Sequence, residues 1–312
     1  MQAPETSVEG LLLTRHWRDT PRGVELILWA WSPDGPIRMI FPNQSAVCFI
    51  ARETSLDYSG AKRQRFERRE LELTDLNGTQ VDGLYFRQQR DLNRFRETAQ
   101  RQDLLLYESE IKPTDRFLME RFVKAPLALS GKCIPKPAFR EYLNPRIKPG
   151  SLSPEFRYLS LDIETDGMDG EILSIAFCNP DTEEILMQGQ AEDWPTTLNI
   201  RWYKGEKALL TGFIDRLRDI DPDLLLGWNL INFDLDYLER RCSLCLVPFN
   251  IGRGGEAAAV LPPQQSGQPS VASIPGRVAL DGIDHLRSAF WSFDSFELGH
   301  VASRLLGRKK LI

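Results

Sequence analysis

The 312-residue sequence has no long apolar run, and it contains only five cysteines and three histidines. A membrane-spanning helix needs about 20 consecutive apolar residues, so no membrane segment is expected. The first ten residues, MQAPETSVEG, lack both the basic start and the apolar core of a secretory signal. We therefore expect a cytoplasmic protein that does not associate with membranes.

Absent motifs exclude several classes of site. Five cysteines scattered through a long chain do not form a disulfide framework. Cys242 and Cys245 have the spacing of half a zinc site, but no second Cys or His pair follows at finger spacing, so they are interpreted as helical cysteines. Neither a glycine-rich cofactor fingerprint nor a Ser/His/Asp arrangement is present, which argues against a small-molecule enzyme.

Charge divides the chain unevenly. Residues 1–150 contain 24 Lys and Arg against 20 Asp and Glu, whereas residues 151–312 contain 15 against 24. Between the two parts, residues 141–155 (EYLNPRIKPGSLSPE) concentrate Pro, Gly and Ser without apolar periodicity. We predict two domains, 1–148 and 149–312, with a basic module followed by an acidic one.

The first domain is predicted to be small and β-rich or α+β. Its expected strands are residues 11–14, 24–31, 81–87 and 103–111, with an amphipathic helix at 88–102. One helix face carries Arg90, Arg94 and Arg101, which, with the basic run at 62–69, could neutralise phosphates. The alternative is an ordinary solvated charged face.

The second domain is predicted to have a mixed sheet with packed helices. Successive strands at 158–165, 171–177 and 183–188 indicate an antiparallel meander, followed by a helix at 206–220, a short strand at 224–226 and a helix from about 234. A strand at 277–283 and a helix near 294–306 end the chain. Residues 250–276 are rich in Gly, Ala, Pro, Gln and Ser, which predicts a mobile loop or a poorly ordered hairpin.

The strand at 158–165 carries two carboxylates. Alternation places Asp162 and Glu164 on one face, opposite the apolar residues 159, 161 and 163. Two adjacent carboxylates repel each other unless a proton or cation intervenes, and oxygen ligands favour Mg²⁺ or Mn²⁺. A lone Asp-x-Glu is more often an exposed strand pair than a metal site.

A second motif strengthens the metal interpretation. Gly227, Trp228 and Asn229 end an apolar run, and Phe233 and Asp234 follow where a helix begins. The chain can thus bring Asp234 close to Asp162 and Glu164. Three carboxylates can hold two metal ions that activate water and stabilise the leaving oxygen of a phosphodiester. Trp228 and Phe233 could stack on bases, although Trp228 is equally well explained as a core aromatic.

These motifs resemble the first two exonuclease motifs of B-family DNA polymerases: Asp162-Ile163-Glu164, and Asn229-x3-Phe233-Asp234. Residues 107–122 (YESEIKPTDRFLMERF), Gly276-Arg277 with Asp281, and the opening LTRHWRDT are similar to that family as well, with the bacterial DNA polymerase II group nearest. The resemblance covers essentially the whole chain except residues 250–276.

The resemblance implies an N-terminal domain that contacts template DNA, followed by a 3′→5′ proofreading exonuclease domain. The exonuclease domain is expected to have a ribonuclease H-like mixed-sheet fold, which is α/β, and the whole chain is expected to be α+β. The resemblance implies that Asp162, Glu164 and Asp234 are catalytic metal ligands in a two-metal Mg²⁺ or Mn²⁺ site. It also implies that Thr165, Asn229 and Phe233, with Trp228 as a further DNA-binding candidate, contact the frayed primer end. Primer-template and single-stranded DNA are the expected partners of a monomer.

The family pattern is incomplete in this chain. A fourth carboxylate, from a later Tyr-x3-Asp motif, does not follow Asp234, and the polymerase aspartates are missing. We therefore expect a fragment, weak or inactive as an exonuclease alone, whose missing partner is the C-terminal polymerase domain. Two alternatives stay open: a stand-alone ribonuclease H-like exonuclease, and a non-catalytic DNA-binding module.

Overall fold

The computed structural model describes residues 7–56, 66–190, 198–263 and 268–308. The chain divides into two compact units, Met1–Pro154 and Glu155–Ile312, and each is described by itself. No helix among the described residues combines the length and apolarity needed to cross a membrane. The first four residues of the basic run predicted at 62–69 lie outside the described residues.

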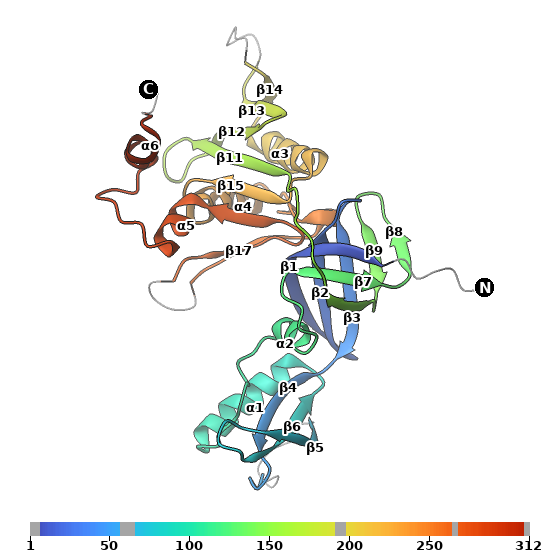
Figure 1. Cartoon of the computed structure of the whole chain (residues 1–312). Coiled ribbons are helices and arrows are strands. Elements are labelled where there is room, and N and C mark those ends of the chain that lie inside the picture. Colours follow the sequence, from blue (N-terminus) through green and yellow to red (C-terminus); the bar gives the residue numbers. More distant parts are fainter. Residues whose placement is uncertain (1–6, 57–65, 191–197, 264–267, 309–312) are drawn as a thin grey trace, which may run out of the picture. The chain divides into compact units, whose positions relative to one another are not determined.

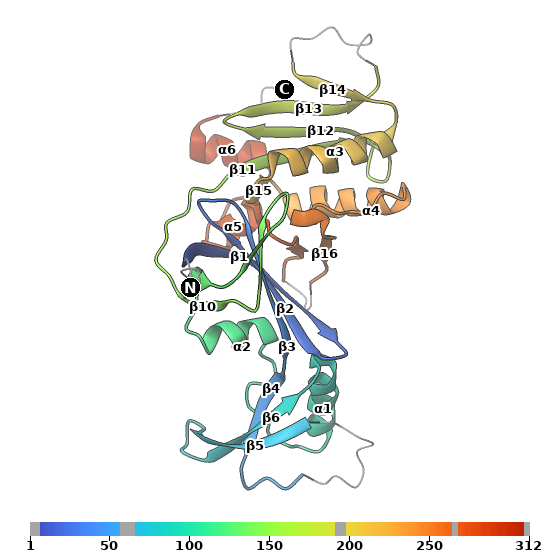
Figure 2. The same ribbon diagram turned by 90° about the vertical axis from the view of Figure 1, so that its right-hand side faces the viewer.

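Unit 1 is built on two sheets that share one hydrophobic core. The larger sheet has the order β10-β7-β1-β2-β3-β9-β8, and the smaller has the order β4-β6-β5. The elements are β1 (Val8–Thr20), β2 (Gly23–Trp31), β3 (Ile37–Gln44), β4 (Ala46–Ala51), β5 (Phe66–Thr74), β6 (Gln80–Phe86), α1 (Gln89–Arg101), α2 (Pro113–Met119), β7 (Pro126–Ser130), β8 (Cys133–Pro135), β9 (Arg140–Leu143) and β10 (Arg146–Pro149). Figure 2 shows α1 lying beside the smaller sheet.

Helix α1 is amphipathic, as predicted. Leu92, Phe95 and Ala99 are buried in the core, while Arg90 and Arg94 are exposed. The predicted strand at 103–111 is wrong, because the only pairing described there is an isolated bridge between Phe49 and Tyr107. This apolar run, Leu-Leu-Leu-Tyr, is a connection to α2 that touches the sheet at one point rather than extending it.

Unit 2 contains a six-stranded mixed sheet with the order β14-β13-β12-β11-β15-β18. Its elements are β11 (Tyr158–Thr165), β12 (Ile172–Asn179), β13 (Thr182–Gln188), β14 (Ile200–Tyr203), α3 (Glu206–Ile220), β15 (Leu224–Gly227), η2 (Leu230–Leu235), α4 (Asp236–Leu244), η3 (Arg253–Gly255), β16 (Ala259–Leu261), β17 (Val271–Ser273), β18 (Val278–Asp281), α5 (Gly282–Ser288) and α6 (Leu298–Leu306). The predicted α/β architecture with a β-rich first part is confirmed.

Strand direction within this sheet sets the position of the site. β11, β12 and β13 pair antiparallel, as the predicted meander requires, whereas β15 and β18 run parallel to β11. The carboxyl ends of β11, β15 and β18 therefore point the same way. Helix α3 packs against β12, β13 and β14. Leu210, Phe213 and Phe177 belong to the hydrophobic core between the helix and the sheet (Figure 1).

The segment predicted to be a mobile loop or poor hairpin forms a short antiparallel hairpin, β16–β17, whose strands pair from Ala259↔Ser273 to Leu261↔Val271. Residues 264–267, between the strands, lie outside the described residues. Its composition had suggested little burial, but Ala258 and Ile274 at its two ends are buried in the unit 2 core. The hairpin is thus tied to the sheet at its base.

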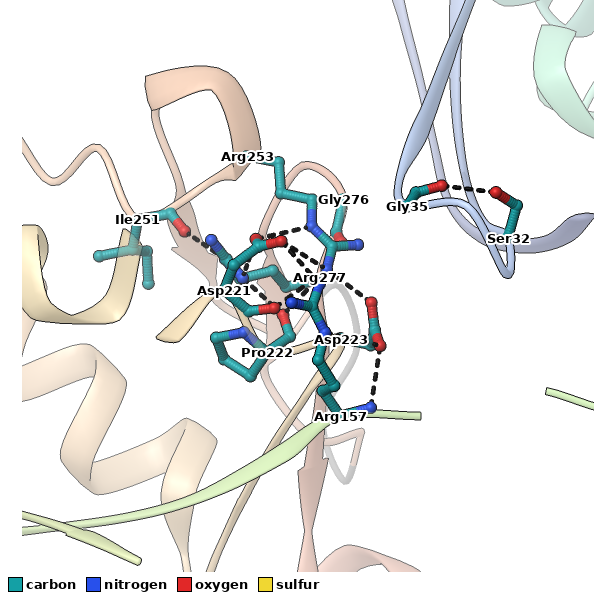
Figure 3. Close-up of polar contacts among 10 residues, drawn as sticks. All are labelled: Ser32, Gly35, Arg157, Asp221, Pro222, Asp223, Ile251, Arg253, Gly276 and Arg277. Atoms are coloured by element: carbon teal, nitrogen blue, oxygen red, sulfur yellow. Dashed lines mark hydrogen bonds and ion pairs between the residues drawn. The ribbon is translucent and has the colours of Figure 1, made fainter. Parts of the chain in front are cut away.

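A buried ion network holds that base (Figure 3). Arg253, before β16, donates from Nη2 to Asp223 Oδ1 and from Nε to Asp221 Oδ1, at 2.5 and 3.0 Å. Arg277, before β18, lies 3.0 Å from the same Asp221 oxygen. Asp223 also accepts a hydrogen bond from the main-chain N–H of Arg157, just before β11. Four segments far apart in the sequence therefore meet at the amino ends of the parallel strands.

This network leaves little water around its charges. Arg253, Arg277 and Asp223 are each 2% exposed or less. Burial lowers the pKa of Arg277 to about 10, and the charge of Asp221 acts against that shift. Even so, the Arg277 guanidinium stays charged at neutral pH. The buried carboxylates therefore keep a cationic partner, and removal of either charge would leave the other one buried and unpaired.

Asp223→Asn should lower the free energy of unfolding of unit 2 by roughly 3 kcal/mol, because it leaves two buried guanidinium groups to share Asp221 as their carboxylate partner. Urea unfolding followed by circular dichroism measures the change. Asp219→Asn, an exposed position on α3, removes the same charge and should stay within about 0.5 kcal/mol of the parent protein. Equal midpoints for both variants would contradict the structural role given to the network.

Candidate active site

Two carboxylates project from one face of β11. Leu159, Leu161 and Ile163 are buried, whereas Asp162 and Glu164 are exposed, so the predicted strand alternation is confirmed. Both acidic residues lie toward the carboxyl end of the strand. They are thus presented at the edge of the sheet where β15 and β18 also end.

The backbone after β15 turns tightly toward β11. A Cβ atom added to Gly227 would lie 3.0 Å from the carbonyl oxygen of Leu161 and 2.9 Å from Leu230 Cβ, so a larger residue would push these strands apart. Asn229 follows with a left-handed φ of 60°, and the π-helix η2 begins one residue later. π-Helical turns are rare and occur frequently at functional sites.

This turn brings Asp234 back to the first pair. Its carboxyl group is buried, and Oδ1 accepts a hydrogen bond of 3.1 Å from the main-chain N–H of Ile163. Ile163 is the residue between Asp162 and Glu164. The structure therefore places the third acidic residue of the prediction against the strand that carries the other two.

Burial and neighbouring charge change the acidity of Asp234. Burial and, after it, the charge of Asp162 raise the pKa of its carboxyl group to about 7, although the hydrogen bond from Ile163 acts in the opposite direction. A carboxyl group in this state is about half protonated at neutral pH. A bound cation would relieve both the burial of the negative charge and the repulsion from Asp162.

Asp281 is an acidic residue that the sequence reasoning noted only within a family stretch and did not assign to the site. It ends β18, opposite Gly227 in the parallel register, and it is buried. Oδ2 accepts from the N–H of Ile231 in η2, and Oδ1 caps α5 by accepting from Ile283. The available signal was an Asp at the junction between an apolar strand and a helix, which is a typical N-cap.

Asp281 therefore fixes the segment that carries Asp234. Its charge is among the causes that raise the pKa of Asp234, and, after burial, it raises the pKa of Asp284 on α5. Negative charge thus gathers at the ends of β11, β15 and β18. Asp281 is a positioning residue, because both of its carboxylate oxygens are engaged by main-chain N–H groups.

The candidate DNA-contacting residues near this edge of the sheet have different contacts within unit 2. Thr165 Oγ1 donates to the carbonyl of Gly167, and Phe233 packs beside Tyr237 with ring centroids 5.7 Å apart. Trp228 donates from Nε1 to the Phe296 carbonyl at 2.9 Å. Its ring also lies so close to Gly282 that an added Cβ would meet it at 2.7 Å. Trp228 is thus partly buried by neighbouring segments, although it is not among the residues of the unit 2 core.

The donor chemistry at this edge suits a hard divalent cation, because the acidic side chains supply carboxylate oxygens. Within residues 7–56, 66–190, 198–263 and 268–308, no three His, Cys, Asp or Glu side chains converge as a group able to hold a metal ion. The full ligand set of Asp162, Glu164 and Asp234 accordingly stays a prediction. The roles of Thr165, Asn229, Phe233 and Trp228 toward DNA stay predictions too.

Comparison with protein families assigns the chain. Residues 106–298 match the family described as DNA polymerase family B, exonuclease domain, and residues 10–45 match DNA polymerase II, N-terminal. The chain belongs to the B family of DNA polymerases. It is 31% identical over 308 residues to DNA polymerase II of Escherichia coli (strain K12), covering 97% of this chain and 39% of that protein.

Other B-family members share parts of the chain. A DNA polymerase of Thermococcus sp. (strain 9oN-7) is 28% identical over 166 residues, which cover half of this chain and 20% of that protein. The solved structure of the family B DNA polymerase from Pyrobaculum calidifontis aligns with a TM-score of 0.69 at 17% identity, covering 96% of this chain and 40% of that one. This chain thus spans about two fifths or less of the length of these B-family relatives.

Asp234→Asn should stabilise this B-family domain at high pH. The pKa of Asp234 in the folded protein, about 7, lies above the ordinary value of 3.8, so the native state binds the extra proton and loses stability as pH rises from about 4 to 7. Above pH 7 the penalty is constant, at up to about 4 kcal/mol. The amide keeps an acceptor for Ile163 and cannot ionise.

Urea unfolding at several pH values measures this difference. The variant should be more stable than the parent above pH 7, and the two should converge near pH 4. Asp236→Asn, at the partly exposed start of α4, is the control and should show no such pH dependence. A parent protein that gains stability between pH 4 and 7 relative to Asp234→Asn would contradict the raised pKa.

Proposed function

We propose that this chain is the N-terminal and 3′→5′ exonuclease part of a DNA polymerase, which removes mismatched nucleotides from the primer end. The observation that carries the proposal is the return of Asp234 to β11. Its buried carboxyl group is bound to Ile163 N–H, between the two acidic residues of the first motif. The family match over residues 106–298 supports the exonuclease assignment.

Asp162, Glu164 and Asp234 are the residues proposed to hold divalent ions, Mg²⁺ or Mn²⁺. When bound, two such ions activate a water molecule and stabilise the leaving oxygen of the phosphodiester. The chain itself supplies the orientation. Ile163 N–H fixes the Asp234 carboxyl group, and Asp281 fixes the π-helical segment on which Asp234 lies.

Residues beside the carboxylates are proposed to hold the frayed primer end. Thr165 ends β11, Asn229 caps the π-helix η2, and Phe233 lies within η2, so all three lie on segments next to Asp162 or Asp234. Trp228 has both polar and ring contacts within unit 2. We accordingly propose that it orders the chain around the site and contacts DNA only indirectly.

Unit 1 is proposed to contact the template strand. A pocket of about 530 Å³ lies on it, and its lining includes the cationic Arg22, Arg87 and Arg90 together with the aromatic Phe66 and Tyr85. Guanidinium groups neutralise phosphates, and aromatic rings stack on bases. Part of the remaining basic run is already paired, since Arg68 binds the buried Asp82.

A non-catalytic DNA-binding module is the second candidate. It is favoured by one observation, that no three potential metal ligands converge within the described part of the chain. Metal binding separates the two candidates, because a module without chemistry has no need for an ion between Asp162 and Asp234.

Calorimetric titration with Mn²⁺ should show saturable binding to this chain and none to the double variant Asp162→Ala, Glu164→Ala. The chain offers a matched control in Asp181→Ala, Glu183→Ala, an exposed Asp-x-Glu of the same spacing where β13 begins. The control should bind as the parent does. Absence of binding by the parent would favour the non-catalytic module.

Exonuclease activity of this chain alone is expected to be weak, because the sequence lacks the fourth carboxylate implied by the family motifs. Digestion of a labelled single strand in Mg²⁺ measures it, with Asp162→Ala as the blank. The rate should exceed that of the blank by less than about tenfold, which corresponds to about 1.4 kcal/mol of barrier lowering. Rapid digestion by the chain would show that three carboxylates suffice.

A further inference from the structure

Four aromatic residues gather in the short connection between α5 and α6: Phe290, Trp291, Phe293 and Phe296. Phe290 is 95% exposed and Trp291 is 50% exposed. The Trp291 and Phe293 rings stack with planes 4° apart and centroids 5.9 Å apart, and Phe296 meets Phe293 edge-on. Three of the four rings thus contact one another in sequence, and the exposed ring of Phe290 belongs to the residue next to Trp291; exposed apolar groups that cluster in this way mark interaction sites.

Phe290 occupies a backbone position that normally belongs to glycine. Its N–H donates to the Arg287 carbonyl, and the next N–H, of Trp291, donates to Leu286, each at 3.0 Å. These two bonds form a Schellman motif, in which the residue after the helix cap is left-handed. Phe290 accordingly has φ of 62°, which is costly for a bulky side chain.

The ring of Phe290 therefore contributes nothing to folding of the described chain. It is solvent-exposed, and its backbone would be less strained with glycine. Strained residues with no stabilising role in the fold are candidates for contact with a ligand.

Phe296, at the other end of the connection, is fixed by two contacts. The guanidinium of Arg287 lies 4.7 Å from the Phe296 ring centroid, and the Phe296 carbonyl accepts from Trp228 Nε1. Trp228 directly follows β15, beside the candidate active site. The aromatic cluster is thus joined through Phe296 to the segment beside the candidate active site.

The aromatic cluster also lies close to the carboxylates. Asp281, which binds the N–H of Ile231 in the segment carrying Asp234, caps the other end of α5. Seven helical residues rise about 10 Å. Stacked nucleotides follow one another at about 3.4 Å, so the length of α5, which separates Asp281 from the connection with Phe290, corresponds to about three nucleotides. Figure 1 shows α5 beside the ends of β15 and β18.

We propose that Phe290 and Trp291 form a stacking platform for unpaired bases of single-stranded DNA, a few nucleotides from the 3′ end that enters the carboxylate site. The proposal rests on the proposed exonuclease function, and it names the residues that hold the separated strand. Every base has a π-face, so the platform accepts any sequence, as the removal of any mismatched end requires.

Phe290→Gly tests the platform because glycine suits the left-handed position and should not unfold the chain. Binding of a 5′-fluorescein oligothymidine of about eight nucleotides is measured by fluorescence anisotropy in EDTA, so that no hydrolysis occurs. The variant should bind at least about fivefold more weakly, and Trp291→Ala should show a similar loss. The salt dependence of binding should stay unchanged, because stacking releases no counter-ions.

A matched control exists in unit 1. Phe122 also has a left-handed φ, of 55°, and is 83% exposed. Phe122→Gly should bind the oligonucleotide within about twofold of the parent, a difference of about 0.4 kcal/mol. Equal weakening by both glycine variants, or none by Phe290→Gly, would overturn the platform, as would absence of binding by the parent.

Failure of the exonuclease proposal has a separate signature. If Mn²⁺ binding does not depend on Asp162 and Glu164 while Phe290→Gly still weakens DNA binding in EDTA, the platform stands and the nuclease assignment falls. If Phe290→Gly abolishes self-association in light scattering and leaves DNA binding unchanged, the rings belong to a protein interface and the platform is wrong.

Discussion

The parallel pairing of β15 and β18 with β11 is the constraint on which the site depends. Parallel strands bring their carboxyl ends to the same edge of a sheet, so Asp162, Asp234 and Asp281 gather there although they are far apart in the sequence. Like charges in such a place repel one another, and the fold tolerates them through main-chain donors and a raised pKa at Asp234.

At the amino ends of the same strands, the buried charges are arranged differently. There the buried charges are matched, since Arg253 and Arg277 meet Asp221 and Asp223. One end of the parallel set is thus electrostatically satisfied by the chain, and the other retains unbalanced negative charge. Such an imbalance is typical of a site that a cation completes, because uncompensated buried carboxylates would otherwise only destabilise the fold.

The sequence predicted those parts of unit 2 that depend on local pattern. Alternation located β11 and the outward face of Asp162 and Glu164, and the 3.6-residue period located α3. The observed division between the units follows Pro154, within the Pro- and Gly-rich stretch from which a boundary was predicted.

What depended on tertiary contacts was not predicted. Asp281 cannot be assigned from a single sequence, because its role comes from the N–H of Ile231, fifty residues earlier. Helix α5 was missed because it follows β18 without an intervening turn. The run at 103–111 has strand-like composition, but no neighbouring strand is available to pair with it beyond a single bridge. The anchoring of residues 250–276 depended on Arg253, whose burial no composition rule indicates.

That anchoring makes the pairing of the sheet strands insensitive to the length of the hairpin. Because Arg253 and Arg277 fix the two stems at the base, the pairing of β15 with β18 does not depend on what lies between them. Lengthening a loop with clamped ends costs only about 0.6 kcal/mol for each doubling. The chain between Leu261 and Val271 can therefore change in length at small cost, whereas the paired strands β16 and β17 are constrained, because they pack on α4 and on η2, the segment that carries Asp234.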